Sequence, residues 1–534
     1  MASNVLLNLS LGTSSFRGLR KANQIYVDKT RLIFDLASQR RKYLLVRPRG
    51  FGKSLLISTF ETLFKNGLED FCGLEIEKLW KGERTYSVVK FDFSEIKPIF
   101  GLKKFERDLK DRLIDNFSGQ GFSYDPNSTS LFSQLSKWLG DQPANSLVVL
   151  IDEYDAPLTS SLHDRILFNE VRGLLSEFYA LLLKANDEAI RFLFITGITK
   201  FNKASIFSEL NNMVDISLNP QFGSLLGYTH EEVENYFDSY LSRASTALNL
   251  SKEDLLTRLT KQYDGFCFEV TANQKVFSPW SLLNFFAAPG LGFCDYWFES
   301  GGRPSVLLEY VKSHTIRDPK EYGREKTISL ASLSGSSDVE SLSDIGLLTQ
   351  EGYLTIKAVE YGNTVFLDYP NLEIKRAMAQ LYTELLLKGK VAGQVGAGDI
   401  VRVLNNDDPE EVFHILNRLF TAIDYQNYPV VDETSVRAFI QVYLAGAGLD
   451  PKVERHNAHG RSDLEVNVGT RLWVFELKTA HEGKSAEAAL QEAIDQLTSR
   501  RYGEQDAVGK LERVALVFSL TERRFVRWAT VSET

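Results

Sequence analysis

Four short apolar runs in the first 225 residues alternate with longer amphipathic stretches, a pattern typical of strands alternating with helices. The runs span 43–46, 87–93, 147–151 and 191–196, and helices are predicted over about 55–63, 103–116 and 165–186. The run at 147–151 is entirely apolar, as expected for a central strand covered on both faces. The alternation predicts a parallel, doubly wound α/β sheet over about residues 25–225.

The pattern changes after residue 228, where helices outnumber apolar strands. Thr229 and Glu232 form a capping-box-like start that predicts a helix running through Tyr240. Short strands are expected at 346–348 and 352–356, as in the wing of a winged helix. The remaining elements are predicted to be helices over 408–423 and 433–445, then alternating strands and a small-residue helix at 488–497.

Composition narrows the class of protein. The chain has 534 residues, of which 43% are hydrophobic and 25% charged, which favours several globular domains. Its apolar runs fall far short of the roughly 18 residues that a membrane span needs, and no leader pattern opens the sequence. The odd number of cysteines excludes a disulfide framework, and the absence of a C-x-x-C pair excludes a cysteine zinc site. We expect a cytoplasmic, multidomain protein that contacts no membrane.

Charge is distributed unevenly along the chain. The net charge is −9, yet residues 1–60 hold eleven Lys or Arg against two Asp, so that segment carries +9 and the rest −18. A basic segment on an acidic chain suits contact with the phosphates of a nucleotide or a nucleic acid. A solvated basic face is an equally good interpretation, and charge alone does not separate the two.

The residues that join the first strand to the first helix form a candidate phosphate-binding loop. They read Arg47-Pro48-Arg49-Gly50-Phe51-Gly52-Lys53-Ser54, and we expect the last six to bind nucleotide. Backbone N–H groups of Gly50, Phe51 and Gly52 can surround a β-phosphate at the helix N-terminus. Lys53 can reach the β- and γ-phosphates, and Ser54 offers a hydroxyl to Mg²⁺. Arg47 stands where the common loop pattern has its first glycine.

An acidic pair follows the third apolar run. Asp152 would hold Mg²⁺ through water or Ser54, and Glu153 would polarise the attacking water. Thr196, at the end of the next strand, is placed to sense the γ-phosphate. The alternative is a strand end that happens to be acidic, but the order of loop, helix, carboxylate pair and sensor favours a site for ATP and Mg²⁺. Since no arginine finger can be identified, binding is better supported than turnover.

A second group of candidate catalytic residues lies in the last hundred residues, where Asp463, Glu476 and Lys478 follow the pattern Asp-x12-Glu-x-Lys. Alternate residues of a strand share a face, so Glu476 and Lys478 project together, and Asp463 on the preceding strand could approach them. Two carboxylates could hold one or two cations, Mg²⁺ or Mn²⁺, that activate water beside Lys478. This spacing is the signature of PD-(D/E)XK nucleases. The alternative is a surface hairpin with a cross-strand ion pair.

Two further residues are candidates for the same site. Glu433, at the start of its helix, could supply a third carboxylate, although an ordinary first-turn acid is an equally good interpretation. Gln496, on the small-residue helix, could reach the site. His456 and His459 form an H-x-x-H pair without further ligand spacing, which indicates loop polarity rather than zinc.

Short motifs similar to those of one family recur along nearly the whole chain. Besides the phosphate loop they are Tyr26-Val27-Asp28-Lys29-Thr30, Asp152-Glu153-Tyr154-Asp155, Thr196-Gly197-Ile198-Thr199-Lys200-Phe201, Tyr263-Asp264-Gly265-Phe266, Phe277-Ser278-Pro279-Trp280-Ser281-Leu282-Leu283, Gly352-Tyr353-Leu354-Thr355 and Gly460-Arg461-Ser462-Asp463. In these motifs the chain resembles the bacterial and archaeal AAA-ATPase-like proteins with a C-terminal PD-(D/E)XK nuclease domain. An arginine at position 47 is usual in that family, whereas other members often have an arginine at the position of Gly50.

The resemblance implies an α/β protein with a P-loop (AAA/STAND-like) parallel-sheet core, a helical lid with a winged-helix-like segment, and a C-terminal α/β restriction-endonuclease-like domain. The expected limits are 1–225 for the ATPase domain, 226–390 for the lid and winged-helix-like region, 391–428 for a helical linker, and 429–534 for the nuclease-like domain. Many family members are suspected to act in phage defence or mobile-element conflict.

The leading hypothesis is an ATP-controlled, metal-dependent nuclease that acts on nucleic acid, with DNA favoured over RNA. The main alternative is a switch that binds nucleotide and a regulatory protein, with a tail that no longer cuts. A DNA-binding regulator is less favoured, because 340–385 contains no helix rich in Arg, Asn or Gln. The sequence leaves open whether the chain forms a homo-oligomer.

Overall fold

The computed structural model describes residues 7–81, 84–183, 188–200, 213–300, 318–334, 344–390, 393, 396–406, 408–457, 460–481, 485–504 and 509–531. Its contacts divide the chain into two compact units. The first unit comprises Met1–Glu309 and Glu325–Asn371, and the second comprises Tyr310–Arg324 and Leu372–Thr534. Of the segment 226–390, expected as the lid and winged-helix-like region, residues 226–309 and 325–371 lie in the first unit. Residues 310–324 and 372–390 lie in the second unit, together with 391–534.

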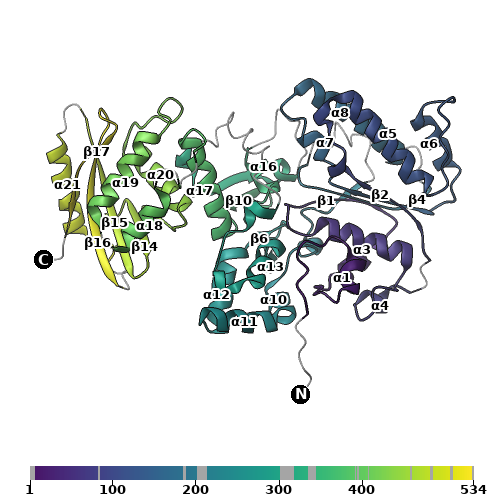
Figure 1. Ribbon diagram of the computed structural model, residues 1–534, viewed down its shortest axis with the longest axis horizontal. Coiled ribbons are helices and arrows are strands. Elements are labelled where there is room, and N and C mark those ends of the chain that lie inside the picture. Colours follow the sequence, from purple (N-terminus) through teal and green to yellow (C-terminus); the bar gives the residue numbers. More distant parts are fainter. Residues whose placement is uncertain are drawn as a thin grey trace, which may run out of the picture. The chain divides into compact units, whose positions relative to one another are not determined.

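A five-stranded parallel sheet forms the centre of the first unit (Figure 1), in the order β2-β3-β4-β1-β5. The strands are β1 (Lys42–Val46), β2 (Ser87–Asp92), β3 (Leu147–Asp152), β4 (Ile190–Gly197) and β5 (Met213–Asp215). Every residue of β1, β3 and β4 is buried, in keeping with their apolar runs. Because the strands are parallel, the carboxyl ends of β1, β3 and β4 meet at one edge of the sheet.

Helices cover both faces of this sheet, which confirms the predicted doubly wound α/β core (Figure 1). On one face lies α3 (Lys53–Asn66), whose Phe60 ring is 5.1 Å from Phe192 and 4.8 Å from Phe194. The other face is covered by α5 (Leu102–Ser118), α6 (Leu131–Gly140) and α8 (Arg165–Leu183). Shorter helices of this part are α1 (Phe16–Lys21), α2 (Thr30–Ala37), α4 (Ile76–Leu79) and α7 (Ala156–Thr159).

The lid has its own apolar core, to which Ile25 and Val27 of the N-terminal segment also contribute. Its helices are α10 (His230–Tyr236), α11 (Asp238–Leu248), α12 (Lys252–Tyr263) and α13 (Pro279–Ala287). The predicted capping box of Thr229 and Glu232 is present. The helix predicted to run through Tyr240 instead ends at Tyr236, since the backbone bends at Phe237 and places that ring 5.3 Å from Phe286.

The winged-helix-like segment is a three-stranded antiparallel sheet in the order β8-β10-β9 with two short helices. Its elements are β8 (Lys326–Ser329), α15 (Leu330–Ser334), α16 (Asp344–Gln350), β9 (Thr355–Glu360) and β10 (Thr364–Asp368). The strand predicted at 346–348 is wrong, because these residues lie in α16. They are all buried, and a short apolar run does not distinguish a buried helical turn from a strand.

The second unit contains a mixed five-stranded sheet in the order β11-β14-β15-β16-β17. The strands are β11 (Lys452–Val453), β14 (Leu464–Val468), β15 (Arg471–Ala480), β16 (Lys510–Ser519) and β17 (Arg524–Thr530). Only β15 and β16 pair in parallel, and α21 (Ala486–Arg500) connects them. A small hairpin of β12 (His456–Asn457) and β13 (Gly460–Arg461) precedes β14.

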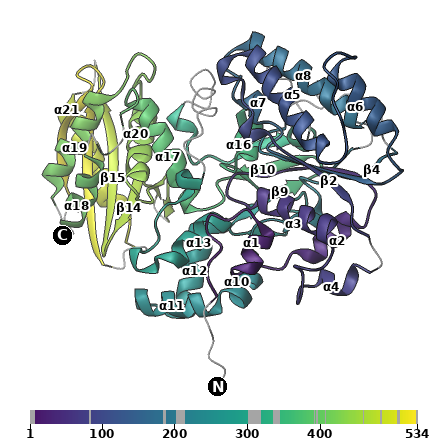
Figure 2. The same cartoon turned by 45° about the vertical axis from the view of Figure 1, so that its right-hand side comes forward.

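Helices lie on both sides of this sheet, with α21 on one side and α18 to α20 on the other (Figure 2). These and their neighbour are α17 (Leu372–Leu386), α18 (Ala397–Asn406), α19 (Pro409–Ala422) and α20 (Glu433–Gly446). The predicted small face of α21 is confirmed, since Ala489 and Ala493 are fully buried against the sheet. Trp473 points the other way and donates from its indole nitrogen to the carbonyl of Leu404 at 2.9 Å.

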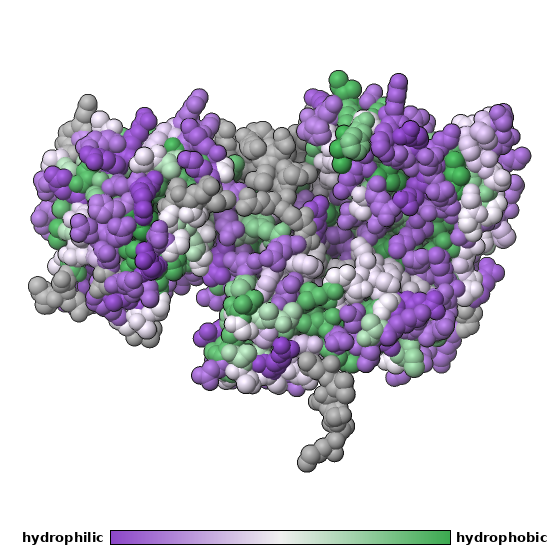
Figure 3. Space-filling view, in the orientation of Figure 1, coloured by the Kyte–Doolittle hydropathy of each residue, from purple (hydrophilic) through white to green (hydrophobic). Residues whose placement is uncertain are grey.

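Hydrophilic side chains dominate the face of each unit seen in Figure 3, with apolar ones in scattered patches. Within the described ranges, no helix combines the length and the hydropathy needed to cross a membrane.

Candidate functional site

The phosphate loop connects β1 to α3 through two glycines with positive φ. Gly50 has φ +78° and Gly52 has φ +94°. In this range of φ the backbone of any residue other than glycine is strained. No atom lies within 4 Å of a Cβ placed on Gly52, so the backbone conformation, and not space, calls for glycine there. Gly52 caps α3, a helix of 14 residues whose first N–H groups face the loop. This arrangement is suited to binding an anion such as phosphate.

Lys53 is one of the three cations of this loop. Its side chain is buried, and its ammonium donates to the carbonyls of Arg47 at 3.0 Å and Pro48 at 2.9 Å. Burial lowers the pKa of Lys53, while the nearby carboxylates, with Asp152 the strongest, oppose that shift. The structure therefore brings Lys53 close to the acidic pair, as the sequence predicts for a lysine that contacts phosphate.

Arg47 has a structural role that sequence reasoning missed. Its guanidinium is 1% exposed and donates to the carbonyls of Val46, Ser217 and Phe222 at 2.9, 2.7 and 3.2 Å. It also lies 4.5 Å from the centre of the Phe268 ring, and burial lowers its pKa to about 9. Arg47 thus ties the phosphate loop to the segment after β5 and to the lid, which explains an arginine where a glycine is common.

Asp152 and Thr196 meet at the carboxyl edge of the sheet, as predicted. Both are buried, and the Thr196 hydroxyl donates to Asp152 Oδ1 at 2.5 Å. Glu153 follows with φ +49°, and burial raises the pKa of its carboxyl. Ser54 is half-buried in the first turn of α3, and no hydrogen bond within the described ranges joins it to Asp152.

The residues after the acidic pair lock β3 to β4. The buried Asp155 carboxylate accepts from the backbone N–H groups of Ile198 and Thr199 at 3.1 and 2.7 Å, and the Tyr154 hydroxyl donates to the Thr199 carbonyl at 2.8 Å. A Cβ on Gly197 would lie 2.5 Å from the Tyr154 ring, which explains the glycine. The motif that carries these residues ends with Phe201, which lies outside the described residues.

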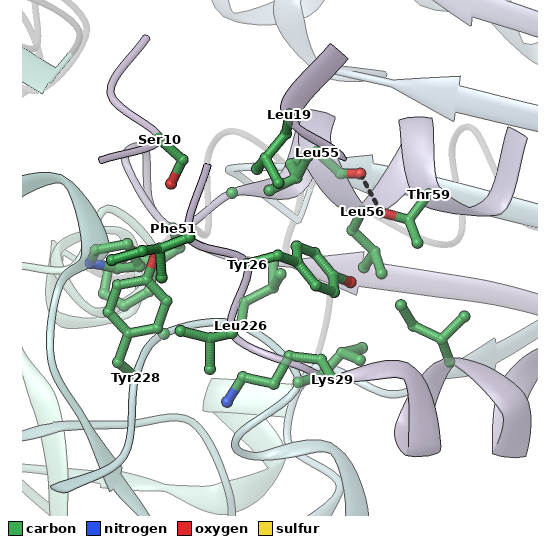
Figure 4. Close-up of a pocket in the computed structure, with 17 residues that line it drawn as sticks. Ser10, Leu19, Tyr26, Lys29, Phe51, Leu55, Leu56, Thr59, Leu226 and Tyr228 are labelled. Carbon is green, nitrogen blue, oxygen red and sulfur yellow. Dashed lines mark hydrogen bonds between the residues drawn. The ribbon is translucent and has the colours of Figure 1, made fainter. Parts of the chain in front are cut away.

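A pocket lies beside the start of α3 (Figure 4). Figure 4 shows the Tyr26 ring between the side chains of α3 and Lys29. The lining of the pocket is mainly apolar and aromatic. It consists of Ser10, Leu19, Ile25, Tyr26, Val27, Lys29, Ile33, Phe51, Gly52, Leu55, Leu56, Thr59, Leu225, Leu226, Gly227, Tyr228 and Pro279. Sequence reasoning missed this pocket, because it combines the N-terminal segment, the loop and the lid.

An ion pair closes one side of the pocket. The Lys29 ammonium lies 2.6 Å from a carboxylate oxygen of Glu232, the residue that completes the capping box of α10. Burial lowers the pKa of Lys29, and Glu232 opposes that shift. The pair links the N-terminal segment to the lid at the edge of the pocket.

The predicted site of the second unit forms at one end of its sheet. Glu476 and Lys478 are buried at alternate positions on the same face of β15. The Lys478 ammonium lies 3.0 Å from Glu476 Oε1. Burial raises the pKa of Glu476, and the charge of Asp463 raises it further. Burial acts to lower the pKa of Lys478, but Glu476 outweighs it, so that the pKa is raised and the ammonium stays charged.

Asp463 is held in place at both carboxylate oxygens. Oδ2 accepts from the backbone N–H of Leu477 at 2.8 Å, and Oδ1 lies 3.4 Å from the guanidinium of Arg437 on α20. Arg437 also donates to Glu454 at 2.7 Å. Sequence reasoning missed Arg437. Because Arg437 lies one helical turn after Glu433, the two share a helix face, and this spacing could have identified it as a candidate.

Glu433 reaches the site, whereas Gln496 does not bond to it. A carboxylate oxygen of Glu433 accepts from the backbone N–H of Thr479 at 3.1 Å, and its charge acts on Lys478. Gln496 lies on α21 with its Oε1 buried, and no hydrogen bond in the described part of the chain joins it to Asp463, Glu476 or Lys478. Over the same residues, no three His, Cys, Asp or Glu side chains gather closely enough to hold a metal ion by themselves.

Two family models match the chain. Residues 10–207 match a model described as predicted AAA-ATPase, and residues 431–528 match one described as PD-(D/E)XK nuclease superfamily. The chain joins an AAA-ATPase-like domain to a PD-(D/E)XK nuclease-superfamily domain. These matches confirm the resemblance found in the sequence. The phosphate loop and the acidic pair lie in the AAA-ATPase-like domain, and Glu433, Asp463, Glu476 and Lys478 lie in the nuclease-like domain.

A relative from Azotobacter chroococcum mcd 1 spans both domains. It is described as an uncharacterized protein in the vnfD 5' region and is 28% identical over 507 residues, which cover 92% of this chain and 93% of that protein. The alignment therefore includes the AAA-ATPase-like and the nuclease-like domain together.

Two solved structures also match at 12% identity with a TM-score of 0.25 each. Cdc6p from Pyrobaculum aerophilum covers 65% of this chain and 87% of its own, and ORC2 from Aeropyrum pernix covers 84% and 90%. The fold assignment rests on the strand order and on the family matches.

Proposed function

We propose that the chain is a metal-dependent nuclease whose cutting is controlled by nucleotide bound to the AAA-ATPase-like domain. The buried Glu476 carboxylate supports this proposal most directly. Its Oε1 contacts Lys478, while its Oε2 has no hydrogen-bond partner among the described residues. A buried carboxylate oxygen without a partner costs free energy, and a bound cation would recover it.

Asp463 and Glu476 are the residues that would hold Mg²⁺ or Mn²⁺, since hard oxygen ligands suit both ions. A bound cation would activate water and neutralise charge on the scissile phosphate. Lys478 stays protonated and can donate to a phosphate oxygen or to the attacking water. Glu433 positions the end of β15 through the N–H of Thr479, next to Lys478.

In the AAA-ATPase-like domain, we propose ATP as the nucleotide. The N–H groups of Gly50 to Gly52 would surround the β-phosphate, with Arg49 and Lys53 as its cations. Ser54 and Asp152 would hold Mg²⁺, and Glu153 would orient the attacking water. Thr196 already donates to Asp152 and would sense the terminal phosphate through it.

The pocket beside α3 would take the purine base. It adjoins Gly52 at the phosphate loop, so a single ligand can place its base and its phosphates in both at once. Tyr26, Tyr228 and Leu226 supply flat and apolar surface for a ring. Replacement of Leu226 by Trp should fill the pocket and weaken nucleotide binding while inorganic triphosphate binding is unchanged.

The test is cleavage of labelled plasmid, single-stranded DNA and RNA by the full chain in Mg²⁺ or Mn²⁺, each with and without ATP. Glu476→Gln should abolish cutting, since loss of a metal ligand worth several kcal/mol corresponds to about a 1000-fold lower rate. Lys53→Ala should remove the effect of ATP. Glu522→Gln is the matched control, because Glu522 is exposed and pairs only with Arg524. DNA is the expected substrate, and cutting of RNA alone would overturn that part of the proposal.

Cutting that survives in Glu476→Gln would place the chemistry elsewhere and refute the assignment. A regulated partner-binding switch with an inactive tail is the second candidate function. The observation that favours it is the guanidinium of Arg437 beside Asp463, where a cation would bind. It predicts no cutting under any condition while ATP still binds.

A role in defence against phage follows from the family resemblance and forms a separate part of the proposal. Cells that carry the wild-type chain should resist phage infection, and cells with Glu476→Gln should not.

A further inference from the structure

The turn that ends α16 packs directly against the phosphate loop. The chain reverses at Gly352, whose φ of +84° allows the Tyr353 N–H to donate to the Leu348 carbonyl at 2.8 Å. A Cβ on Gly352 would lie 2.8 Å from Cγ of Pro48 and 3.0 Å from Trp297. Both the backbone conformation and the close approach to Pro48 therefore require glycine here.

The same turn also binds the segment after β4. The Gln350 side-chain oxygen accepts from the backbone N–H of Lys200 at 2.8 Å. Lys200 is itself fixed by an ion pair with Asp215 at 2.8 Å. The turn thus contacts the segments that follow β1 and β4, whose carboxyl ends lie at the edge of the sheet where the proposed phosphates bind.

Glu351 lies between these two contacts. Its carboxyl interacts electrostatically with Arg49 and Lys53, two of the three cations of the phosphate loop, and with Asp155. Burial raises its pKa to about 7, which Arg49 and Lys53 oppose and Asp155 reinforces. A carboxylate in this place lies in the electric field of the same cations that would attract the phosphates of a nucleotide.

We infer that Glu351 makes the phosphate site prefer a nucleoside diphosphate over a triphosphate. The inference rests on the proposed binding of nucleotide. With the turn in place, a third phosphate meets the negative carboxylate of Glu351 beside Arg49 and Lys53. A diphosphate binds without disturbing the turn, whereas a triphosphate binds only when the turn leaves Pro48 and Lys200.

The winged-helix-like segment would transmit a displacement of the turn to the lid, within the first unit. Chain 352–354 leads from the turn into β9, and β10 leads to Asn371, whose side-chain amide donates to the Asp264 carbonyl of the lid at 2.8 Å. Displacement of the turn by a third phosphate would therefore act on a segment anchored to the lid.

The experiment measures the Kd of ADP and of a non-hydrolysable ATP analogue for the full chain, by displacement of fluorescent ADP in Mg²⁺. The ratio of the analogue's Kd to that of ADP is the readout. Glu351→Gln should lower this ratio about tenfold, because it removes one charge–charge repulsion and keeps the side-chain shape. Glu360→Gln, an exposed change of the same charge on β9, should leave the ratio at the wild-type value.

Gly352→Ala is a second variant that does not alter Glu351. Its new Cβ meets Pro48 and should displace the turn, so the ratio should fall as well. An unchanged ratio in both variants, with ADP bound normally, overturns the role of Glu351 and leaves nucleotide binding intact. Failure of the wild-type chain to bind either nucleotide refutes the proposed function and this inference with it.

Discussion

The two candidate sites are built in opposite ways. In the AAA-ATPase-like domain, most binding groups come from one run of eight residues and are backbone N–H groups set by two glycines. In the nuclease-like domain, the groups are side chains from β15, from α20 and from the residue just before β14, oriented through backbone donors such as the N–H of Leu477 and of Thr479. The first site therefore depends on the path of the loop, and the second on several elements meeting at one end of a sheet.

The comparison predicts different consequences when the buried Arg47 is removed from the first site and the partly buried Arg437 from the second. Arg47 holds a loop to distant segments, whereas Arg437 orients the carboxylates of Asp463 and Glu454. The first change should alter stability, and the second should alter the metal requirement.

Arg47→Gly should have the largest effect, although it restores the glycine common in such loops. It removes three buried hydrogen bonds that a charged donor makes to backbone carbonyls, which should destabilise the first unit by about 3 kcal/mol or more. Scanning calorimetry of the full chain measures this change. Arg49→Gly, at the exposed neighbouring arginine, should keep the wild-type transition and weaken nucleotide binding. A wild-type transition in Arg47→Gly would contradict the structural role.

Arg437→Ala should have an intermediate effect, confined to the nuclease-like domain. Without the guanidinium, Asp463 keeps only the N–H of Leu477, so the Mg²⁺ concentration for half-maximal cutting should rise about tenfold. Arg461→Ala is the matched control, because Arg461 also pairs with Glu454 but is half exposed. A fall in the Mg²⁺ requirement would show that Arg437 blocks the site, in favour of the inactive-tail alternative.

The smallest effect is expected from pH at the phosphate loop. Since the pKa of Glu351 is raised to about 7, its carboxyl is mostly neutral at pH 6 and charged at pH 8. Repulsion of a third phosphate should grow as the pH rises, and the ratio of triphosphate to diphosphate Kd should increase a few-fold. Arg49, Lys53 and Asp155 are the charged groups that face Glu351. Glu351→Gln supplies the baseline, and equal slopes in both proteins would contradict this prediction.

Sequence reasoning succeeded where the chemistry is local in the chain. The phosphate loop is contiguous in the sequence. An apolar run such as 147–151 forms a central strand in an α/β fold, so β3 and the acidic pair after it were predictable. The proximity of Asp463 to Glu476 was also predictable, because Asp463 directly precedes β14, which pairs with β15.

It failed where a residue acts on a partner far away in the sequence. Arg47 contacts Ser217 and Phe222, and no local sequence pattern predicts such a contact. Glu351 was hidden because the apolar run before it was interpreted as a strand, which places no turn at Gly352. Gln496 stays a prediction: it lies on the helix that packs on the sheet, and in the described part of the chain no hydrogen bond joins it to the carboxylates.

The path of the chain bears on how such a protein can be taken apart or recombined. The chain passes between the units three times, because residues 310–324 belong to the second unit while 325–371 return to the first. Within the second unit, Tyr322 donates to the Lys375 carbonyl at 3.1 Å, and Lys320 lies 3.9 Å from Asp432. A gene cut at residue 372 would leave these contacts behind. A second unit transferred to another protein with these contacts intact would need this short upstream piece of chain as well.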